Sequence, residues 1–162
     1  MATDTKYSSI FGVTAIDKVG NIGTIYDNTY NVPWVIYTIS GNTYQLFPMQ
    51  NLTSRGMNST TTNTGGYTAS DMYTYIHNTI LPNLKRSGLN ITACDLVSQS
   101  VYNDIVSKTG MTSVTIAGGE DFWLADPGSS YSFYYVGSDG IIYDYGNAII
   151  SFAVRPLITV VK

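Results

Sequence analysis

The chain has 162 residues, enough for one domain with a buried core, and it is poor in charged residues (12%) but rich in aromatic ones (13%, with 14 tyrosines). Disordered chains show the opposite composition, so we expect a folded protein. A net charge of −3 with scattered basic residues argues against a nucleic-acid partner, and no apolar run approaches the roughly 20 residues that membrane insertion needs.

The first part of the chain predicts a polar N-terminal segment followed by a β-hairpin. Residues 1–31 are broken by turn-forming pairs, and the first residues lack the basic-then-apolar order of a signal peptide. Residues 34–39 are β-branched and aromatic, and residues 43–47 alternate as a second strand after a Ser-Gly-Asn turn. Residues 53–68 are rich in Ser, Thr, Asn and Gly, which predicts a surface loop.

Two helices are predicted in the middle of the chain. Ser70 is of the residue type that caps helices, and apolar residues recur behind it at helical spacing as far as Leu81. We expect Pro82 to end or kink this helix. A second helix is predicted to begin near Asp95 and to end around Lys108 and Gly110.

From Val114 onward, β-prone runs alternate with turn signals. The runs are VTIA, FWL, SFYYV, IIY, IISFAV and ITVV, and pairs such as Asp139-Gly140 separate them. Strands, then helices, then strands predict an α+β fold with an antiparallel sheet rather than alternating βαβ units.

No catalytic constellation is recognisable, so we predict a protein that is not an enzyme and uses no cofactor. His77 is the only histidine, is interpreted as a polar residue on a helix surface, and has no nucleophile elbow to serve. Cys94 is the only cysteine, which excludes an internal disulfide and a thiolate metal cluster, and it is interpreted as a buried residue.

Carboxylates are the remaining candidates for chemistry. Glu120 and Asp121 are adjacent, and neighbouring side chains of a strand point to opposite faces, which argues against a glycosidase pair. Asp126, Asp139 and Asp144 offer the oxygen ligands that calcium prefers, but no Asp-x-Asp-x-Asp loop is present. We therefore predict no metal site, while calcium binding stays open.

Residues 126–147 have the composition of a binding surface. Tyrosine combined with Ser, Gly and Asn is typical of antibody-like binding loops, and aromatic faces also stack on sugars while Asp and Asn bind the hydroxyls. The alternative is that these tyrosines belong to a core or to a subunit interface. The candidate ligand-binding residues are Asp126, Tyr131, Tyr134, Tyr135, Tyr143, Asp144, Tyr145 and Asn147.

A series of motifs resembles a family of bacterial and phage domains. Its W-W-L-R-S-P-like segment, D-G turn and closing G-V-R-P have counterparts here in Asp121-Phe122-Trp123-Leu124, Pro127-Gly128, Ser138-Asp139-Gly140 and Val154-Arg155-Pro156-Leu157. The Gly66-Tyr67 and Ser70-Asp71-Met72 segments resemble its helix entry, and Asp95-Leu96-Val97-Ser98 resembles a later segment, so the likeness spans residues 32–162. The family is similar to the C-type-lectin-like superfamily, in the branch shared with formylglycine-generating enzymes and variable proteins of diversity-generating retroelements.

The resemblance implies an α+β, C-type-lectin-like fold in which twisted antiparallel sheets and two helices display a ligand-binding face on the C-terminal strands. Ala125 and Ala153 stand where the family has arginine and glycine, which puts in doubt a salt bridge from position 125. The formylglycine-generating enzymes need a cysteine pair, and calcium-dependent lectins show Glu-Pro-Asn or Trp-Asn-Asp motifs, none of which is present. Trp34, Trp123 and Arg155 are interpreted as structural anchors.

These observations predict residues 32–162 as a ligand-binding domain and residues 1–31 as an oligomerisation or attachment arm. The expected function is recognition of a host-cell surface glycan or protein by a phage virion or an extracellular surface assembly, and a homo-oligomer, for instance a trimer, is expected. The alternative is a structural or decoration protein of a capsid or tail, with the tyrosines in subunit contacts.

Overall fold

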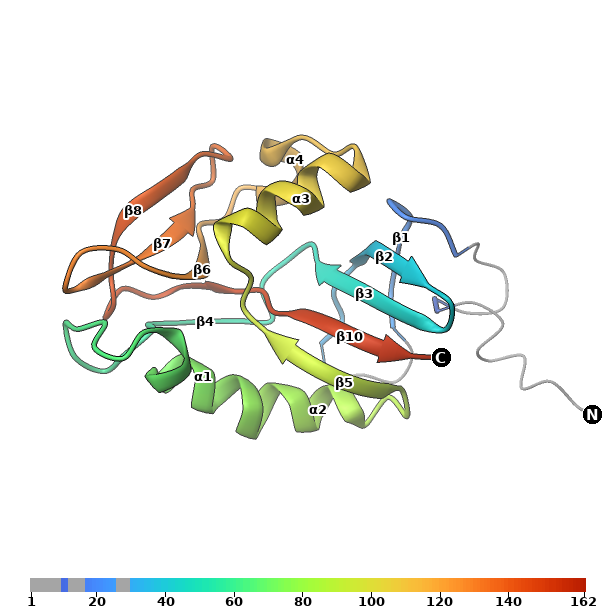
Figure 1. Ribbon diagram of the computed structural model, residues 1–162, viewed down its shortest axis with the longest axis horizontal. Coiled ribbons are helices and arrows are strands. Elements are labelled where there is room, and N and C mark those ends of the chain that lie inside the picture. Colours follow the sequence, from blue (N-terminus) through green and yellow to red (C-terminus); the bar gives the residue numbers. More distant parts are fainter. Residues whose placement is uncertain (1–9, 12–16, 26–29) are drawn as a thin grey trace, which may run out of the picture.

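The protein consists of two β-sheets with helices packed on them (Figure 1). The structure is a computed structural model and describes residues 10–11, 17–25 and 30–162. The strands are β1 (Ile22–Gly23), β2 (Trp34–Ser40), β3 (Thr43–Pro48), β4 (Thr53–Arg55), β5 (Asn90–Asp95), β6 (Phe122–Pro127), β7 (Ser132–Val136), β8 (Ile142–Asn147), β9 (Phe152–Val154) and β10 (Leu157–Val161). The helices are η2 (Tyr67–Ala69), α1 (Asp71–Tyr75), η3 (Ile76–Ile80), α2 (Leu81–Lys85), α3 (Gln99–Thr109) and α4 (Ser113–Ala117).

The first sheet joins strands from both ends of the chain. Its order is β1-β2-β3-β10-β5, with antiparallel pairing throughout. The predicted hairpin is confirmed as β2 and β3, and the closing strand β10 lies between β3 and β5. Because β10 comes last in sequence, this sheet is complete only when the whole domain has formed.

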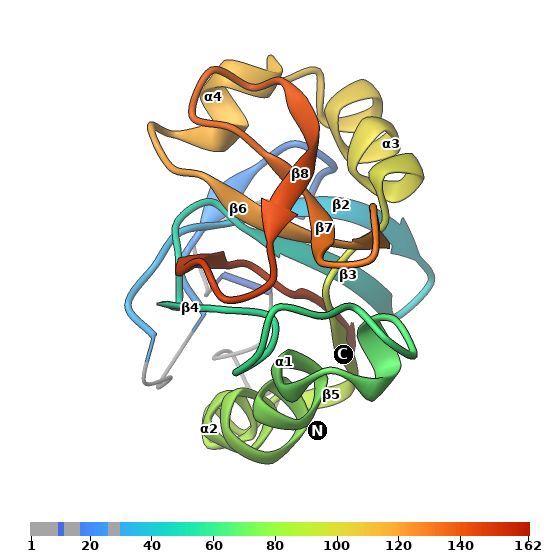
Figure 2. The ribbon, with the colours of Figure 1, turned by 90° about the vertical axis from the view of Figure 1, so that its left-hand side faces the viewer.

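The second sheet carries most of the predicted binding stretch. Its order is β4-β9-β6-β7-β8, and the strands predicted at FWL and SFYYV are confirmed as β6 and β7. The pairing is antiparallel except between β6 and β9, which run parallel, so the sheet is not purely antiparallel as predicted. Figure 2 shows β7 and β8 at one end of the molecule, with α3 and α4 above them and α1 below.

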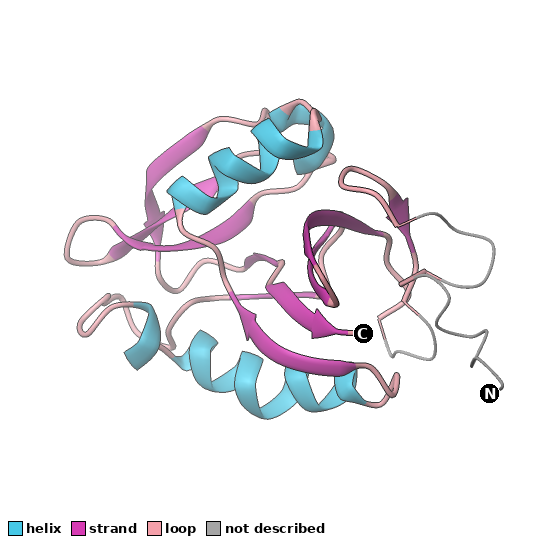
Figure 3. Cartoon of the chain, turned by 45° about the vertical axis from the view of Figure 1, so that its right-hand side comes forward, coloured by secondary structure: helices cyan, strands magenta, loops and turns pink. Residues whose placement is uncertain are grey.

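Pro82 does not end the first helix, and the predicted irregularity takes the form of a π-helical turn just before it. Ser70 is the N-cap of the helix, as expected, and the Ser70 Oγ accepts a hydrogen bond from the Tyr73 N–H at 3.1 Å. The segment η3 is a π-helical turn in which the Leu81 N–H bonds to the Ile76 carbonyl. Pro82 then occupies the first turn of α2, where its missing N–H is tolerated, and the helical path continues to Lys85 (Figure 3).

Two further predictions in the helical region were wrong. The second helix does not begin near Asp95, because residues 90–95 pair with β10, and α3 begins instead behind the cap Ser98. The run VTIA was predicted as a strand and is the helix α4. The Thr112 side chain caps the N-terminus of α4 and Gly118 ends the helix in the left-handed conformation, so local capping outweighs the strand preference of Val and Ile.

One loop prediction and one strand prediction also need correction. Residues 53–55, placed in a surface loop, form the edge strand β4 opposite β9. Within the predicted strand IISFAV only residues 152–154 are extended, since residues 149 and 150 lie in a turn closed by the Ile150 N–H and the Asn147 carbonyl.

The described part of the N-terminal segment is integrated into the domain. The strand β1 pairs with β2, and Ile10 and Ile25 are buried in the same core cluster as Trp34. The oligomerisation or attachment role predicted for residues 1–31 stays a prediction, and residues 1–9, 12–16 and 26–29 of this segment lie outside the described residues.

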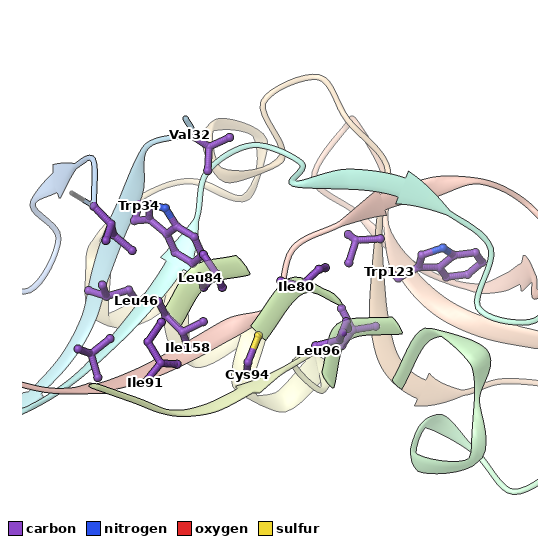
Figure 4. Packing of buried hydrophobic residues seen from close by; sticks show 14 of the residues in the cluster. Val32, Trp34, Leu46, Ile80, Leu84, Ile91, Cys94, Leu96, Trp123 and Ile158 are labelled. Atoms are coloured by element: carbon purple, nitrogen blue, oxygen red, sulfur yellow. The ribbon is translucent and has the colours of Figure 1, made fainter. Parts of the chain in front are cut away.

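The core has two parts, one on each side of the second sheet. The larger cluster lies between the sheets and the first helix and extends from Trp34 to Trp123 (Figure 4). The smaller cluster packs Phe122 and Leu124, from the opposite face of β6, against α3 and α4. Cys94 is buried, as predicted, and burial raises the pKa of its thiol. The overall class is a mixed α+β fold dominated by two sheets, and no helix among the described residues has the length and apolar character of a membrane span.

Candidate ligand-binding surface

Three of the predicted tyrosines come together on one face of the second sheet. Tyr135 on β7 is the register partner of Tyr143 on β8, and their rings stack with centroids 5.3 Å apart. Tyr145 meets the Tyr135 ring edge-on at 5.9 Å, and Phe152 on β9 lies 4.6 Å from it. We call Tyr135, Tyr143, Tyr145 and Phe152 the aromatic patch.

The aromatic patch extends from the core to the surface. Tyr135 is buried, Phe152 and Tyr143 are half-buried, and Tyr145 is 59% exposed. Trp123 supports the patch from inside, with its ring 4.7 Å from Phe152 and 6.4 Å from Tyr135. Gly146 permits this packing, because a Cβ there would lie 2.7 Å from the Trp123 ring. An exposed tyrosine held on a rigid aromatic base is a good platform for binding, because little conformational entropy remains to be lost.

Hydrogen bonds fix the patch at its outer edge. The Tyr143 hydroxyl donates to Asp139 Oδ2 at 2.5 Å, and the Ile141 N–H donates to Oδ1 of the same carboxylate at 3.0 Å. The Asp139 contact, with lesser desolvation, raises the pKa of Tyr143 to about 12. Tyr143 therefore stays protonated at neutral pH, with its ring held in place.

The other predicted residues do not join the patch. Tyr134 lies on the opposite face of β7 and packs against the smaller core cluster. The Asp126 Oδ2 accepts a hydrogen bond from the Gln99 N–H at 2.7 Å, so it caps α3. Tyr131 and Asp144 are exposed, and Asn147 accepts a hydrogen bond from the Ile149 N–H in the turn after β8.

The three residues interpreted as anchors are fully buried. Trp123 Nε1 donates to the Arg55 carbonyl at 2.8 Å, whereas Trp34 Nε1 has no hydrogen-bond partner in the described part of the chain. Arg155 donates to the Ile116 and Ala117 carbonyls at 2.5 and 2.7 Å, and it pairs with Glu120 at 2.5 Å. These contacts link the C-terminal end of α4 to the residue that follows the strand β9.

An open hollow beside the patch was not predicted from the sequence. It has a volume of about 440 Å³ and is lined by Thr53, Ser54, Arg55, Gly56, Asn58, Ser59, Tyr75 and Ile149. We call this hollow the Arg55 hollow. Arg55 on β4 is the register partner of Phe152 on the neighbouring strand β9, and Phe152 belongs to the aromatic patch. A signal existed in the sequence, since Arg55 is the one charged residue between positions 53 and 68.

A smaller hollow corrects the interpretation of the carboxylates. Glu120 and Asp121 both line a space of about 290 Å³ together with Ser54 and Phe152. They precede β6, so the alternation of a strand does not apply to them. Both are engaged, because Glu120 pairs with Arg155 and the Asp121 carboxylate accepts the Ser138 N–H at 2.7 Å.

His77 is more enclosed than predicted. Its Nε2 lies 2.8 Å from Asp95 Oδ1, which also accepts the Tyr67 hydroxyl at 2.9 Å, and its ring stacks on Tyr73 at 4.1 Å. Among residues 10–11, 17–25 and 30–162, no group of three His, Cys, Asp or Glu side chains is placed to hold a metal ion. No protein-family model, curated protein or solved structure matches the chain.

Proposed function

We propose that this protein is a non-enzymatic binding module that recognises a surface glycan through the aromatic patch. The observation that carries the proposal is Tyr145, an exposed ring on a stacked base of Tyr135 and Tyr143. Sugar rings present C–H faces that pack on such aromatic surfaces, while their hydroxyls need polar neighbours. Polar neighbours are available in the adjoining hollows, which contain Ser54 and Asn58.

We propose further that the fold is C-type-lectin-like. The long first helix and α3 supply the two helices that this architecture needs, and the sheet β4-β9-β6-β7-β8 displays the C-terminal strands. Trp123 and Arg155, the residues on which the resemblance rests, are both buried. On this proposal the protein belongs to a phage virion or a similar surface assembly, as a homo-oligomer, and its ligand is on a host cell.

A specific observation favours a second candidate, a structural role in a capsid or tail. Ile141 and Val114 are 55% and 59% exposed. Gly140, which precedes Ile141, lies close to Val114, because a Cβ on Gly140 would lie 2.7 Å from the Val114 backbone nitrogen. Exposed apolar residues that adjoin one another are typical of subunit interfaces, and this pair lies at the corner between α4 and the β7–β8 turn.

The test compares Tyr145→Ala with Ile141→Ser in binding to an array of surface oligosaccharides and in sedimentation. If the patch binds glycans, Tyr145→Ala weakens binding by about tenfold or more and Ile141→Ser leaves it unchanged. Tyr145→Phe keeps the ring and should retain most of the affinity. No glycan binding by the wild-type protein, with oligomers that dissociate in Ile141→Ser, would replace the proposal by the structural role.

A further inference from the structure

Arg55 ends the strand β4, and its guanidinium stacks on an aromatic ring but makes no ion pair with any described residue. Its Cζ lies 4.2 Å above the centre of the Tyr75 ring, and its Nε is buried without a hydrogen-bond partner. No ion pair to it exists within the described part of the chain, whereas Arg155, Lys108 and Lys162 each pair with a carboxylate. A partly buried cation without a partner is costly, so this position favours an external anion.

The space around the guanidinium suits a small polar ligand. Arg55 and Tyr75 line both the Arg55 hollow and a second open hollow of about 370 Å³, so the cation lies between two spaces of ligand size. Ser54, Asn58 and Ser59 provide hydroxyl and amide groups, and Tyr75 and Ile149 provide apolar surface.

The carboxylate that lines the second hollow does not pair with Arg55. Asp71 lines the second hollow, but its Oδ2 accepts the Ser59 N–H at 2.8 Å and it makes no ion pair with Arg55. The first helix also positions Tyr75 against the guanidinium, and an aromatic face is a favourable stacking surface for arginine.

We propose that Arg55 binds the carboxylate of an acidic sugar, an inference that rests on the proposed function and specifies its ligand. A guanidinium matches a carboxylate with two parallel hydrogen bonds. A single cation among hydroxyl and amide groups suits a sugar acid better than a polyanion, which would need a cluster of basic residues. Phe152 lines the smaller hollow together with Ser54, and Ser54 also lines the Arg55 hollow, so an extended oligosaccharide has a path from the aromatic patch to Arg55.

The experiment measures binding of the full chain to a glucuronic-acid-containing oligosaccharide, to the methyl ester of its carboxyl group and to inorganic phosphate. The wild-type protein should bind the acid about tenfold more tightly than the ester. In Arg55→Gln that preference should disappear while the affinity for the ester is unchanged, and Arg55→Lys should restore part of it. Arg86→Gln, on the exposed end of the first helix, is the matched control and should keep the full preference.

The outcomes separate this inference from the proposed function. Equal binding of acid and ester by the wild-type protein, or an acid preference that survives in Arg55→Gln, would overturn the role of Arg55 and leave glycan recognition by the patch intact. Phosphate binding as tight as that of the acid would make the site a general anion site and overturn the sugar-acid assignment. Failure of every oligosaccharide to bind would overturn both proposals.

Discussion

At the scale of single residues, the two buried tryptophans have different roles. Trp123 supports the aromatic patch and donates its indole N–H to the Arg55 carbonyl, so it links the patch to the Arg55 hollow. Trp34 fills the other end of the same core cluster, and its indole N–H has no partner among the described residues. The unpaired indole N–H of Trp34 already lowers stability, so its removal leaves no other group without a partner. Removal of the Trp123 indole N–H leaves the carbonyl that it binds without this donor.

This difference predicts unequal costs for two identical substitutions. Trp123→Phe should lower the free energy of unfolding by about 1–2 kcal/mol more than Trp34→Phe, because only the first leaves the partly buried Arg55 carbonyl without its indole donor. Both variants lose the same ring volume, so each is the control for the other in urea unfolding. A Trp34→Phe variant as unstable as Trp123→Phe would contradict the assignment.

At the scale of elements, the helix α3 depends on two caps from different parts of the chain. The Ser98 Oγ accepts the Val101 N–H at 3.2 Å, and Asp126 on β6 accepts the Gln99 N–H at 2.7 Å. The first cap is local, and the second fastens the helix to the second sheet. Asp126 therefore contributes to the packing of α3 rather than to the aromatic patch.

Removing either cap should destabilise the fold without affecting recognition. Ser98→Ala and Asp126→Ala are each expected to lower the free energy of unfolding by about 1 kcal/mol. Asp144→Ala removes an exposed carboxylate of the same region and should change stability by less than about 0.5 kcal/mol. Chemical unfolding and the glycan-binding assay together test this, and a loss of glycan affinity in Asp126→Ala at unchanged stability would return Asp126 to the binding site.

At the scale of the whole molecule, tyrosine hydroxyls donate hydrogen bonds to carboxylates, and Asp104 and Asp17 among these carboxylates also pair with a lysine. Tyr37 donates to Asp104, Tyr44 to Asp17 at 2.7 Å, Tyr67 to Asp95 and Tyr143 to Asp139. The tyrosines of these pairs lie on strands of both sheets and in the short helix η2. The pairs also make stability depend on pH at both extremes.

The aspartates cause the predicted loss of stability at low pH. Hydrogen bonds from Tyr37 and Lys108 lower the pKa of Asp104, and that from Tyr143 lowers the pKa of Asp139. A lowered pKa in the folded state means that the unfolded chain binds protons first, so stability is full above about pH 4 and falls as the pH drops further. Urea midpoints between pH 2 and 7 measure this, and Asp104→Asn should flatten the fall.

The tyrosines cause the predicted loss of stability at high pH. Burial, with the contact to Asp104, raises the pKa of Tyr37 to about 12, and burial with Asp17 does the same for Tyr44. Between about pH 10 and 12 the unfolded chain loses these protons and the folded chain keeps them, so stability falls as the pH rises. Tyr37→Phe should weaken this fall, and urea midpoints that stay constant from pH 9.5 to 12 would contradict the account.

The sequence alone determined the features that local chemistry controls. The hairpin β2–β3, the cap at Ser70, the end of α3 at Gly110 and the burial of Cys94 all depend on residues close in the chain or on hydrophobicity. Capping residues also flank VTIA, at Thr112 and Gly118, and they favour a helix more strongly than the strand preference of Val and Ile opposes it.

Only the tertiary structure decided which of these residues share a face. A bulge and the order β4-β9-β6-β7-β8 bring Tyr135, Tyr143 and Tyr145 together and turn Tyr134 to the other side. Because β5 pairs with β10, α3 begins later in the chain than the sequence predicts. Because β4 pairs with β9, Arg55 lies beside Phe152. Such pairings join residues that are far apart in sequence, and a one-residue change of register reverses the direction of every side chain, so local patterns cannot specify them.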